Sequence, residues 1–405
     1  MTTLAVLLVA VPVATFAAAY VIYPAVLWVL VRVAGDTGPP WPPGDPDPWP
    51  RVSLLVPVYN EAEVIRGKIE NLLALDYPPD RRQVVVVSDA SDDGTDEIVQ
   101  KFADRGVELV RVTERGGKTA AQNAAVQHLD GDIVVNTDAT TRLAPDALKA
   151  LIRPFQNPGV GVASGRNVSV GRETGPVAVG ESRYVGYEMW VRELETRLGG
   201  IVGASGAYYA IRGELFSSMY PGELSRDFGT VLLARKLGYA AVTVHDAVCR
   251  VPRSGSIRGE MRRKTRTMTR GLETLWHFRE LMNPFRFGTF SLRLGLHKLG
   301  RWSTYLFYPL GLAALGWLAL RVPVAAALFV PWVVVGIVGA VGLVWPEEAP
   351  GLQRPVPRIV GLCGYFVAAG VAGAAAWYKA LTGERNPIWE PTRRQDTTSA
   401  SAMRG

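Results

Sequence analysis

The distribution of charge along the chain constrains its fold more than any other feature of the sequence. Residues 3–31 contain no charged side chain, and residues 303–380 form a second apolar block with few charges. Between them, residues 51–300 have the mixed composition of an ordinary soluble domain. A helix needs about 20 apolar residues to span the hydrocarbon core of a membrane, and both blocks are long enough. The sequence therefore predicts an integral membrane protein whose soluble domain is anchored at both ends.

The flanks of the first apolar block predict its orientation. The run Leu4–Val31 is too long for the apolar part of a signal peptide and lacks a basic start, so we interpret residues 1–35 as an uncleaved transmembrane anchor. Its first positive flank, Arg32, lies on the C-terminal side. Because positive flanks tend to stay in the cytoplasm, we expect the soluble domain there and the chain in the plasma membrane.

The second block predicts C-terminal transmembrane helices within 303–382. Candidate spans lie at about 303–321, 324–345 and 358–380. Three crossings would leave the Arg-rich tail, residues 383–405, outside the cell, against the charge rule. The number of crossings stays open at this point.

The cysteine content and the net charge limit the classes of partner that we expect this protein to bind. Cys249 and Cys363 are far apart in sequence, so a disulfide framework is not expected. The net charge is +7, but the basic residues cluster at 250–270 and 279–301, beside the second apolar block. Basic stretches beside membrane spans contact anionic headgroups more often than nucleic acid. We therefore predict amphipathic interface helices over 256–302, with membrane lipids and no nucleic acid as partners.

Within the soluble region, buried strands alternate with helices. A Pro- and Gly-rich linker covers 36–50. The pattern then predicts strands at 52–57, 83–88, 108–112 and 132–136, and helices at 61–75, 93–105 and 119–129. This alternation indicates an α/β fold with a mostly parallel sheet and helices on both faces. Ligands of such sheets bind beyond the carboxyl ends of the strands.

Acidic and small polar residues follow three of these strands. Asp89 and Asp138 come directly after apolar strands, at the edge where a ligand would bind. Asp92 and Asp93 have a second explanation, because Ser, Asp and Gly in this order also turn the chain and cap the next helix. Both explanations stay open for these two residues.

Four ordered motifs resemble those of family 2 inverting glycosyltransferases. They are Val56-Pro-Val-Tyr-Asn-Glu61, the Asp-x-Ser-x-Asp-Gly run from Asp89, Gly117-Lys118, and Thr137-Asp138-Ala. They are similar to the membrane branch that includes the cellulose, chitin and hyaluronan synthases. The resemblance implies a GT-A-like nucleotide-sugar-binding domain over 51–255. It also implies hexosyl or N-acetylhexosaminyl transfer from a UDP-sugar to a polysaccharide or lipid-linked acceptor at the cytoplasmic membrane face.

The resemblance also assigns donor-binding residues. Pro57, Tyr59 and Glu61 correspond to residues that shape the uridine pocket, Asp89 to a reader of the uracil edge, and Lys118 to a loop cation that meets uracil or phosphate. A solvated loop lysine is the alternative for Lys118. Asp138 corresponds to the first aspartate of the family's Asp-x-Asp signature, whose metal neutralises the leaving diphosphate. Thr140 stands at the second position, so we expect Mg²⁺ or Mn²⁺ at Asp138 and Thr140 with fewer carboxylate ligands than usual.

On the acceptor side, Ser205 and Gly206 lie in a segment that resembles the family's small-residue segment, where the acceptor approaches the donor sugar and small residues permit close backbone approach. Asp227 corresponds to the family's general base, and Arg226 replaces its usual acidic neighbour. A carboxylate here would take the proton of the acceptor hydroxyl. A helix N-cap is the alternative for Asp227.

Basic residues before the second apolar block stand where processive synthases have Gln-x-x-Arg-Trp. Arg263 and Arg266 correspond to the Gln and Arg, and arginine forks suit a diphosphate clamp. Thr267 replaces the Trp, which argues against long processive synthesis. Headgroup contact is an equally good explanation for Arg262 and Arg270.

Two alternatives for the whole chain remain. One is a polyprenyl-phosphate glycosyltransferase that adds a single sugar, because an ionised acceptor phosphate needs no base. The other is a catalytically inactive, nucleotide-binding membrane scaffold, which the departures at Thr140 and Arg226 leave open.

Overall fold

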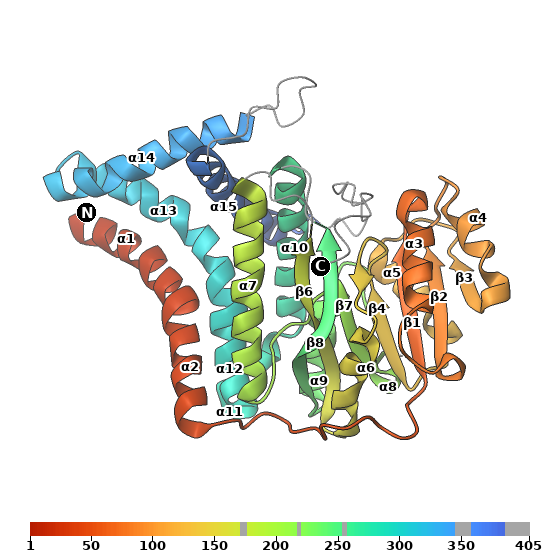
Figure 1. Cartoon of the computed structure of the whole chain (residues 1–405). Coiled ribbons are helices and arrows are strands. Elements are labelled where there is room, and N and C mark those ends of the chain that lie inside the picture. Colours follow the sequence, from red (N-terminus) through yellow and green to blue (C-terminus); the bar gives the residue numbers. More distant parts are fainter. Residues whose placement is uncertain (171–175, 217–219, 253–256, 345–357, 385–405) are drawn as a thin grey trace.

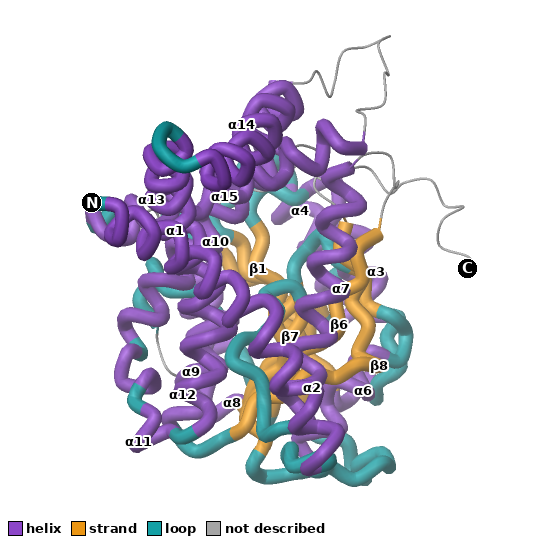
Figure 2. Tube along the Cα trace, turned by 90° about the vertical axis from the view of Figure 1, so that its left-hand side faces the viewer, coloured by secondary structure: helices purple, strands orange, loops and turns teal. Residues whose placement is uncertain are grey.

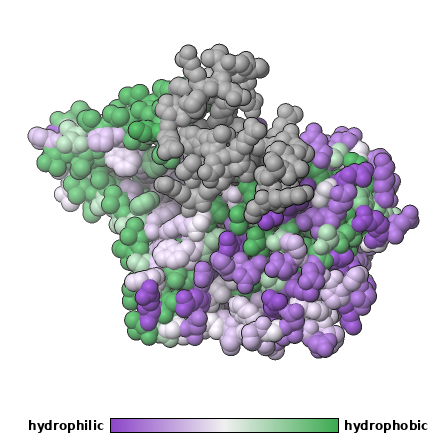
Figure 3. Space-filling model, in the orientation of Figure 1, coloured by the Kyte–Doolittle hydropathy of each residue, from purple (hydrophilic) through white to green (hydrophobic). Residues whose placement is uncertain are grey.

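The computed structural model describes residues 1–170, 176–216, 220–252, 257–344 and 358–384. A domain built around one β-sheet lies beside a group of long helices (Figure 1). On the face seen in Figure 3, apolar residues gather over the helical part, and hydrophilic residues cover most of the sheet domain. The separation of charge along the sequence is therefore also a separation in space.

The sheet of the described residues has eight strands in the order β3-β2-β1-β4-β7-β6-β8-β5. They are β1 (Val52–Val58), β2 (Arg82–Ser88), β3 (Val107–Arg111), β4 (Ile133–Thr137), β5 (Arg142–Leu143), β6 (Val160–Val170), β7 (Tyr208–Arg212) and β8 (Ala240–Pro252). Strands β3, β2, β1 and β4 are parallel, β7 is antiparallel to both β4 and β6, and β6 is parallel to β8. The predicted α/β fold with a mostly parallel sheet is confirmed, and its four predicted strands are β1 to β4.

Helices cover both faces of this sheet. They are α3 (Ala62–Leu73), α4 (Thr95–Gln100), α5 (Lys118–Ala124), α6 (Ala147–Ile152), α7 (Pro176–Arg197), α8 (Gly213–Phe216) and α9 (Arg226–Lys236). Successive strand residues point to opposite faces, so Leu54 packs in the cluster that contains Ile65 and Ile69 of α3. Leu55 packs in the other cluster, which contains Ala121 of α5. Each such fully buried side chain stabilises the fold by about 1.5–3 kcal/mol, which fixes the strand ends in place.

The long helices form the second part of the molecule. They are α1 (Thr2–Ala17), α2 (Tyr23–Ala34), α13 (Arg301–Ala319), α14 (Pro323–Val344) and α15 (Arg358–Thr382), with a π-helical turn at Ala18–Ile22 between the first two. Among the described residues, three helical stretches are long and apolar enough to cross a membrane: Thr2–Ala34, Pro323–Val344 and Ile359–Thr382.

Helix α13 lies along the N-terminal helix. Gly311 meets the ring of Pro12, and a Cβ at Gly311 would lie 2.5 Å from Pro12 Cγ. Gly300 meets Ala19 in the same way at 3.4 Å. The numbering rises on one helix as it falls on the other, so α13 runs antiparallel to α1.

Helix α10 (Ile257–His277) connects the two parts, followed by α11 (Pro284–Phe287) and α12 (Thr289–Leu294). Met268 and Leu272 of α10 pack against Ala376 of α15. Thr274 of α10 accepts a hydrogen bond from the backbone N–H of Ser225, at the start of α9. Figure 2 gives a second view of α10 among the long helices. Helix α10 therefore joins the sheet domain to a candidate membrane helix.

Candidate active site

A cavity of about 270 Å³ lies beyond the carboxyl ends of β1 and β4. Ten of the twelve residues predicted to bind or act line it: Pro57, Glu61, Lys118, Asp138, Thr140, Ser205, Gly206, Asp227, Arg263 and Arg266. Tyr59 and Asp89 are outside this lining. Residues separated by up to about two hundred positions are therefore brought to one cavity at the sheet edge where ligands of α/β folds bind.

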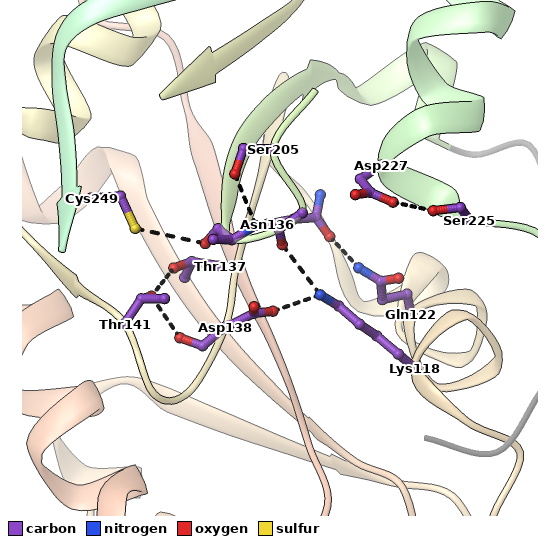
Figure 4. A network of polar contacts seen from close by, with 12 residues as sticks. Lys118, Gln122, Asn136, Thr137, Asp138, Thr141, Ser205, Ser225, Asp227 and Cys249 are labelled. Carbon is purple, nitrogen blue, oxygen red and sulfur yellow. Dashed lines mark hydrogen bonds and ion pairs between the residues drawn. The ribbon is translucent and has the colours of Figure 1, made fainter. Parts of the chain in front are cut away.

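Lys118 and Asp138 form an ion pair inside the cavity (Figure 4). The Nζ of Lys118 lies 2.6 Å from Oδ1 of Asp138 and also donates to the carbonyl oxygen of Gly206 at 3.2 Å. Lys118 is the first residue of α5 and follows Gly117, whose φ of 88° suits glycine. Lys118 is thus not a solvated loop lysine: it joins the end of β4 to the acceptor-side segment.

Asp89 holds the loop that presents Lys118. Its two carboxylate oxygens accept hydrogen bonds from the backbone N–H groups of Gly116 and Gly117, at 2.9 and 2.8 Å. The residue is 1% exposed. Hydrogen bonds to a carboxylate are roughly twice as strong as neutral ones, so they fix this turn. In the structure Asp89 positions the loop, and its reading of a base stays a prediction.

The loop after β1 has its own contacts. The guanidinium carbon of Arg115 lies 3.7 Å from the ring centroid of Tyr59, a close cation–π contact. Asp92 accepts a hydrogen bond from the side chain of Asn60 at 2.8 Å. Asp93 accepts from the backbone N–H groups of Ala62 and Thr95, both at 3.0 Å. Of the two explanations for Asp92 and Asp93, the turn interpretation therefore agrees with their contacts.

A buried lysine supports the loop that carries Asp138. Lys68 of α3 is 0% exposed, and its Nζ donates to the hydroxyl oxygens of Thr137 and Thr141 at 2.8 and 3.1 Å. Burial lowers the pKa of Lys68 to about 7. The sequence carried a signal for it, because Lys68 shares a helical face with Ile65, Ile69 and Leu72, all fully buried.

Asp227 lies in the first turn of α9, whose N-cap is Ser225. The Ser225 hydroxyl donates to Oδ1 of Asp227 at 2.5 Å. Gly206 approaches from the other side, and a Cβ there would lie 2.6 Å from Oδ2. The N-cap alternative for Asp227 is therefore wrong: its carboxylate points into the cavity between Ser225 and Gly206.

Arg226, the departure from the family's acidic pair, is part of the core. It is 3% exposed, its guanidinium carbon lies 4.0 Å from the ring centroid of Phe216, and it donates to the carbonyl oxygen of Phe216 at 3.0 Å. Burial lowers the pKa of its guanidinium. The side chain anchors the start of α9 rather than replacing a catalytic group.

Helix α10 closes the cavity with arginines. Arg263 makes a two-pronged ion pair with Glu260, at 2.8 and 2.7 Å. Arg270 donates to the hydroxyl of Thr119 at 2.6 Å and to the carbonyl of Gly222 at 3.1 Å. The headgroup explanation for Arg270 is therefore replaced by a contact with the loop that leads into α9. For Arg262, which is exposed, that explanation stays a prediction.

The charges lining the cavity suit an anion. The basic members are Lys118, Arg226, Arg263, Arg266 and Arg270, and the acidic members are Glu61, Asp138 and Asp227. Five basic groups against three acidic groups leave an excess of two positive charges. Arginine and lysine in this number match the oxygens of a diphosphate.

The predicted metal site fits a divalent ion that is shared with a ligand. The described residues contain no group of three or more His, Cys, Asp or Glu side chains that could hold a metal alone. Asp138 and Thr140 line the same cavity, so they offer one carboxylate and one hydroxyl. Mg²⁺ is typically held by one or two carboxylates together with water and substrate phosphates. The residues therefore fit Mg²⁺ or Mn²⁺ that takes most of its ligands from a diphosphate.

Gln122 and Asn167 of the cavity, and Asn136 beside them, were not predicted from the sequence. Gln122 of α5 donates to Oδ1 of Asn136 at 2.7 Å, and Asn167 of β6 donates to the hydroxyl of Ser205 at 2.7 Å. Gln122 and Asn167 line the cavity. Asn136 ends a predicted strand, so it could have been predicted as a site residue from its position. The sequence around Asn167 contains no pattern that would have indicated such a role.

The α/β sheet, with its carboxylate and lysine at the ligand-binding edge and an arginine-bearing helix across it, has the GT-A-like fold of glycosyltransferases. Residues 53–217 match the model of the family described as Glycosyl transferase family 2. Residues 53–217 are thus similar to a glycosyltransferase family 2 domain. Membership of the cellulose, chitin and hyaluronan synthase branch stays a prediction.

Named relatives agree with this class. The chain is 28% identical over 228 residues to an N-acetylglucosaminyltransferase of Mesorhizobium japonicum, covering 51% of this chain and 53% of that protein. It is 29% identical over 179 residues to a beta-monoglucosyldiacylglycerol synthase of Synechocystis sp., covering 42% of this chain and 37% of that protein. The chain thus spans about half the length, or less, of these curated relatives.

A solved structure matches almost the whole chain. The mannosyltransferase PcManGT from Pyrobaculum calidifontis, in complex with GDP-Man and Mn²⁺, is 26% identical and has a TM-score of 0.69. The match covers 93% of this chain and 100% of that chain, so it includes helices beyond the family 2 domain.

Proposed function

We propose that this protein transfers a sugar from a UDP-sugar to an acceptor hydroxyl on a saccharide or lipid-linked molecule, with inversion at the anomeric carbon. One observation carries the proposal: Lys118, Asp138, Asp227 and the arginines of α10 line a single cavity at the ligand-binding edge of the sheet. The relatives named as N-acetylglucosaminyl- and glucosyl-transferring proteins support hexosyl or N-acetylhexosaminyl transfer.

Each of these cavity residues has its own role in the proposed reaction. The acceptor oxygen attacks the anomeric carbon, Asp227 accepts the hydroxyl proton, and the bond from that carbon to the diphosphate breaks with its electron pair leaving on the phosphate oxygen. Arg263 and Arg266, with Lys118, stabilise the negative charge that develops on the leaving diphosphate. The absence of a side chain at Gly206 lets the acceptor-side segment approach Asp227 closely, because a Cβ there would lie 2.6 Å from Oδ2.

A divalent ion, when bound at Asp138 and Thr140, would neutralise diphosphate oxygens. The Mn²⁺ in the complex of the mannosyltransferase PcManGT supports this choice. Lys118 already pairs with Asp138. Donor and ion together would therefore release Lys118 toward phosphate.

We also propose that transfer occurs at the cytoplasmic face of the plasma membrane. Arg32 stands at the C-terminal end of the candidate span Thr2–Ala34, immediately before the linker to the sheet domain. The positive-inside rule then supports a cytoplasmic position for the cavity.

The direct test is nucleotide release by the full-length protein in detergent. UDP-glucose, UDP-N-acetylglucosamine and GDP-mannose are each offered with membrane lipid extract, with Mn²⁺ or with a chelator. We expect release from a UDP-sugar that depends on the metal. Release from GDP-mannose alone would refute the UDP assignment, and no release from any donor would favour the inactive scaffold.

A further inference from the structure

A second cavity of about 440 Å³ lies between α7 and the strands β6 and β8. It shares Asn167 with the first cavity, and Asn167 donates to the hydroxyl of Ser205, on the acceptor-side segment. Asn167 therefore links the second cavity to the segment Ser205–Gly206, which approaches the carboxylate of Asp227. The volume of the second cavity falls within the range of roughly 300–1,000 Å³ that is typical of small-molecule sites.

The floor of the second cavity is a bulge in the sheet. Gly165 pairs with Val244, but the next residue, Arg166, pairs with Val248, so three residues of β8 bulge out of the ladder. His245, the first of them, lies on the cavity, with its two ring nitrogens 2.7 and 3.2 Å from a guanidinium nitrogen of Arg166. Bulges next to functional sites re-aim side chains, which here places two polar groups on one ligand-sized hollow.

Helix α7 supplies an apolar wall that leads toward a membrane helix. Met189 and Trp190 line the cavity, and Trp190 is 41% exposed. The Trp190 ring lies 6.1 Å from that of Tyr187, which lies 6.4 Å from Tyr20. Tyr20 in turn stacks on Phe16 at 4.8 Å, within the candidate span Thr2–Ala34.

We propose that the second cavity binds the acceptor, and that the acceptor is a membrane lipid with a hydroxyl-bearing head group. The head group lies at Asn167, Arg166 and His245, which offer hydrogen bonds to hydroxyls. The apolar part lies over Trp190 and follows the aromatic row toward α1, so the lipid reaches the base without leaving the membrane surface. This inference rests on the proposed glycosyl transfer and adds the class of its acceptor.

The test compares acceptors that differ in their apolar part. With the donor identified above, release of nucleotide by the full-length protein is measured with methyl β-glucoside, with octyl β-glucoside, and with vesicles of phosphatidylcholine containing dioleoylglycerol. We expect stimulation by at least one probe with an apolar part, and much less by methyl β-glucoside. Equal stimulation by the methyl and octyl glucosides would overturn the lipid assignment.

Trp190→Ala then tests the position of the acceptor. We expect KM for the stimulating acceptor to rise on the order of tenfold, with KM for the donor unchanged, because the lost contact is on the acceptor alone. Trp190→Phe should restore most of the affinity. Trp276→Ala is the matched control, since Trp276 is 72% exposed on α10 and lines neither cavity.

The outcomes separate the two proposals. An unchanged acceptor KM in Trp190→Ala, or a rise in the KM of donor and acceptor together, refutes the second cavity as the acceptor site. A wild-type protein that hydrolyses the donor but responds to no lipid-borne probe also refutes it, with the proposed function intact. A wild-type protein that releases nucleotide from no donor refutes the proposed function itself.

Discussion

The two walls of the first cavity are held in place by different means. The strand-end wall consists of the loops at 57–61, 116–118 and 137–141, and the helical wall consists of residues 203–209, residues 225–227 and α10. In the strand-end wall, two of the three loops are fixed by a buried side chain of the same sheet domain: Asp89 holds the Gly116–Gly117 turn, and Lys68 holds the loop after β4. The helical wall is fixed by Arg226 at the start of α9 and by α10, which packs on α15.

Because of this difference, we expect the two walls to contribute to different steps of the proposed reaction. The strand-end wall can form within a soluble sheet domain and offers Lys118 and Asp138 to a nucleotide. The helical wall offers Asp227 from α9 and the arginines from α10, which lies between the start of α9 and a candidate membrane helix. We therefore expect changes in the helical wall to act mainly on turnover and phosphate binding, and changes in the strand-end wall to act on donor and metal.

The largest expected effect comes from Asp227→Asn. Loss of the base should lower kcat by about a thousandfold, since general bases contribute roughly 10²–10⁴. Binding of UDP, measured by calorimetry, should be unchanged. Asp80→Asn is the control, because that carboxylate is 80% exposed on the surface. Full turnover in Asp227→Asn would favour an acceptor that is already ionised, such as a polyprenyl phosphate.

In the strand-end wall, Asp138→Asn should lower kcat/KM by about a hundredfold, because the divalent ion that neutralises the leaving diphosphate loses its carboxylate ligand. The variant should also lose most of its response to added Mn²⁺. Retention of the full metal response, measured by nucleotide release across a Mn²⁺ titration, would move the metal site away from Asp138.

Arg266→Ala should weaken UDP binding by roughly tenfold through loss of one charge-assisted contact. The matched control is Arg262→Ala on the same helix, since Arg262 is exposed and outside the cavity lining. Equal losses in both variants would indicate a general effect of positive charge rather than a phosphate clamp.

The smallest effect concerns Lys68 and the stability of the strand-end wall. Its pKa of about 7 in the folded protein lies below the value of about 10.4 expected in the unfolded chain. Between these values the unfolded chain holds the proton and the folded protein does not, so stability rises with pH by at most about 1.4 kcal/mol per unit. Below pH 7 the cost of burying the charge is fully present.

Lys68→Met should remove this rise, while Lys101→Met, at an exposed position of the sheet domain, should keep it. The measurement is denaturant unfolding of the full-length protein in detergent at several pH values. A variant with the same pH slope as the wild type would contradict the buried, easily deprotonated lysine.

Local sequence patterns were sufficient to predict the strand-end wall. Runs such as Val52–Val58 and Arg82–Ser88 are short and mostly apolar, so they could be predicted as strands. Polar residues come directly after each run in the sequence, so the ligand-binding ends of these strands could be predicted as well. Strand β7 was not predicted as part of the sheet. Its antiparallel pairing with β4 joins residues more than seventy positions apart, and the local pattern of Tyr208–Arg212 does not specify that partner.

The helical wall could be predicted only through resemblance to a family. Residues of α9 and α10 have no common local pattern, and their meeting depends on packing across the boundary between domain and membrane helices. The core position of Arg226 and the second cavity beside Asn167 likewise depend on long-range packing. Asp227 was predicted from the sequence as a site residue. That it is not the N-cap of α9 could be seen only in the structure, where Ser225 takes that position.

The most direct test of whether both walls bind a single diphosphate ligand is hydrogen–deuterium exchange of the full-length protein during a titration with UDP and Mn²⁺. We expect protection of the Gly116–Lys118 turn and of α10 around Arg263 to appear together, with the same dependence on UDP concentration. Protection that is confined to the turn, with α10 unchanged at saturation, would contradict the shared site.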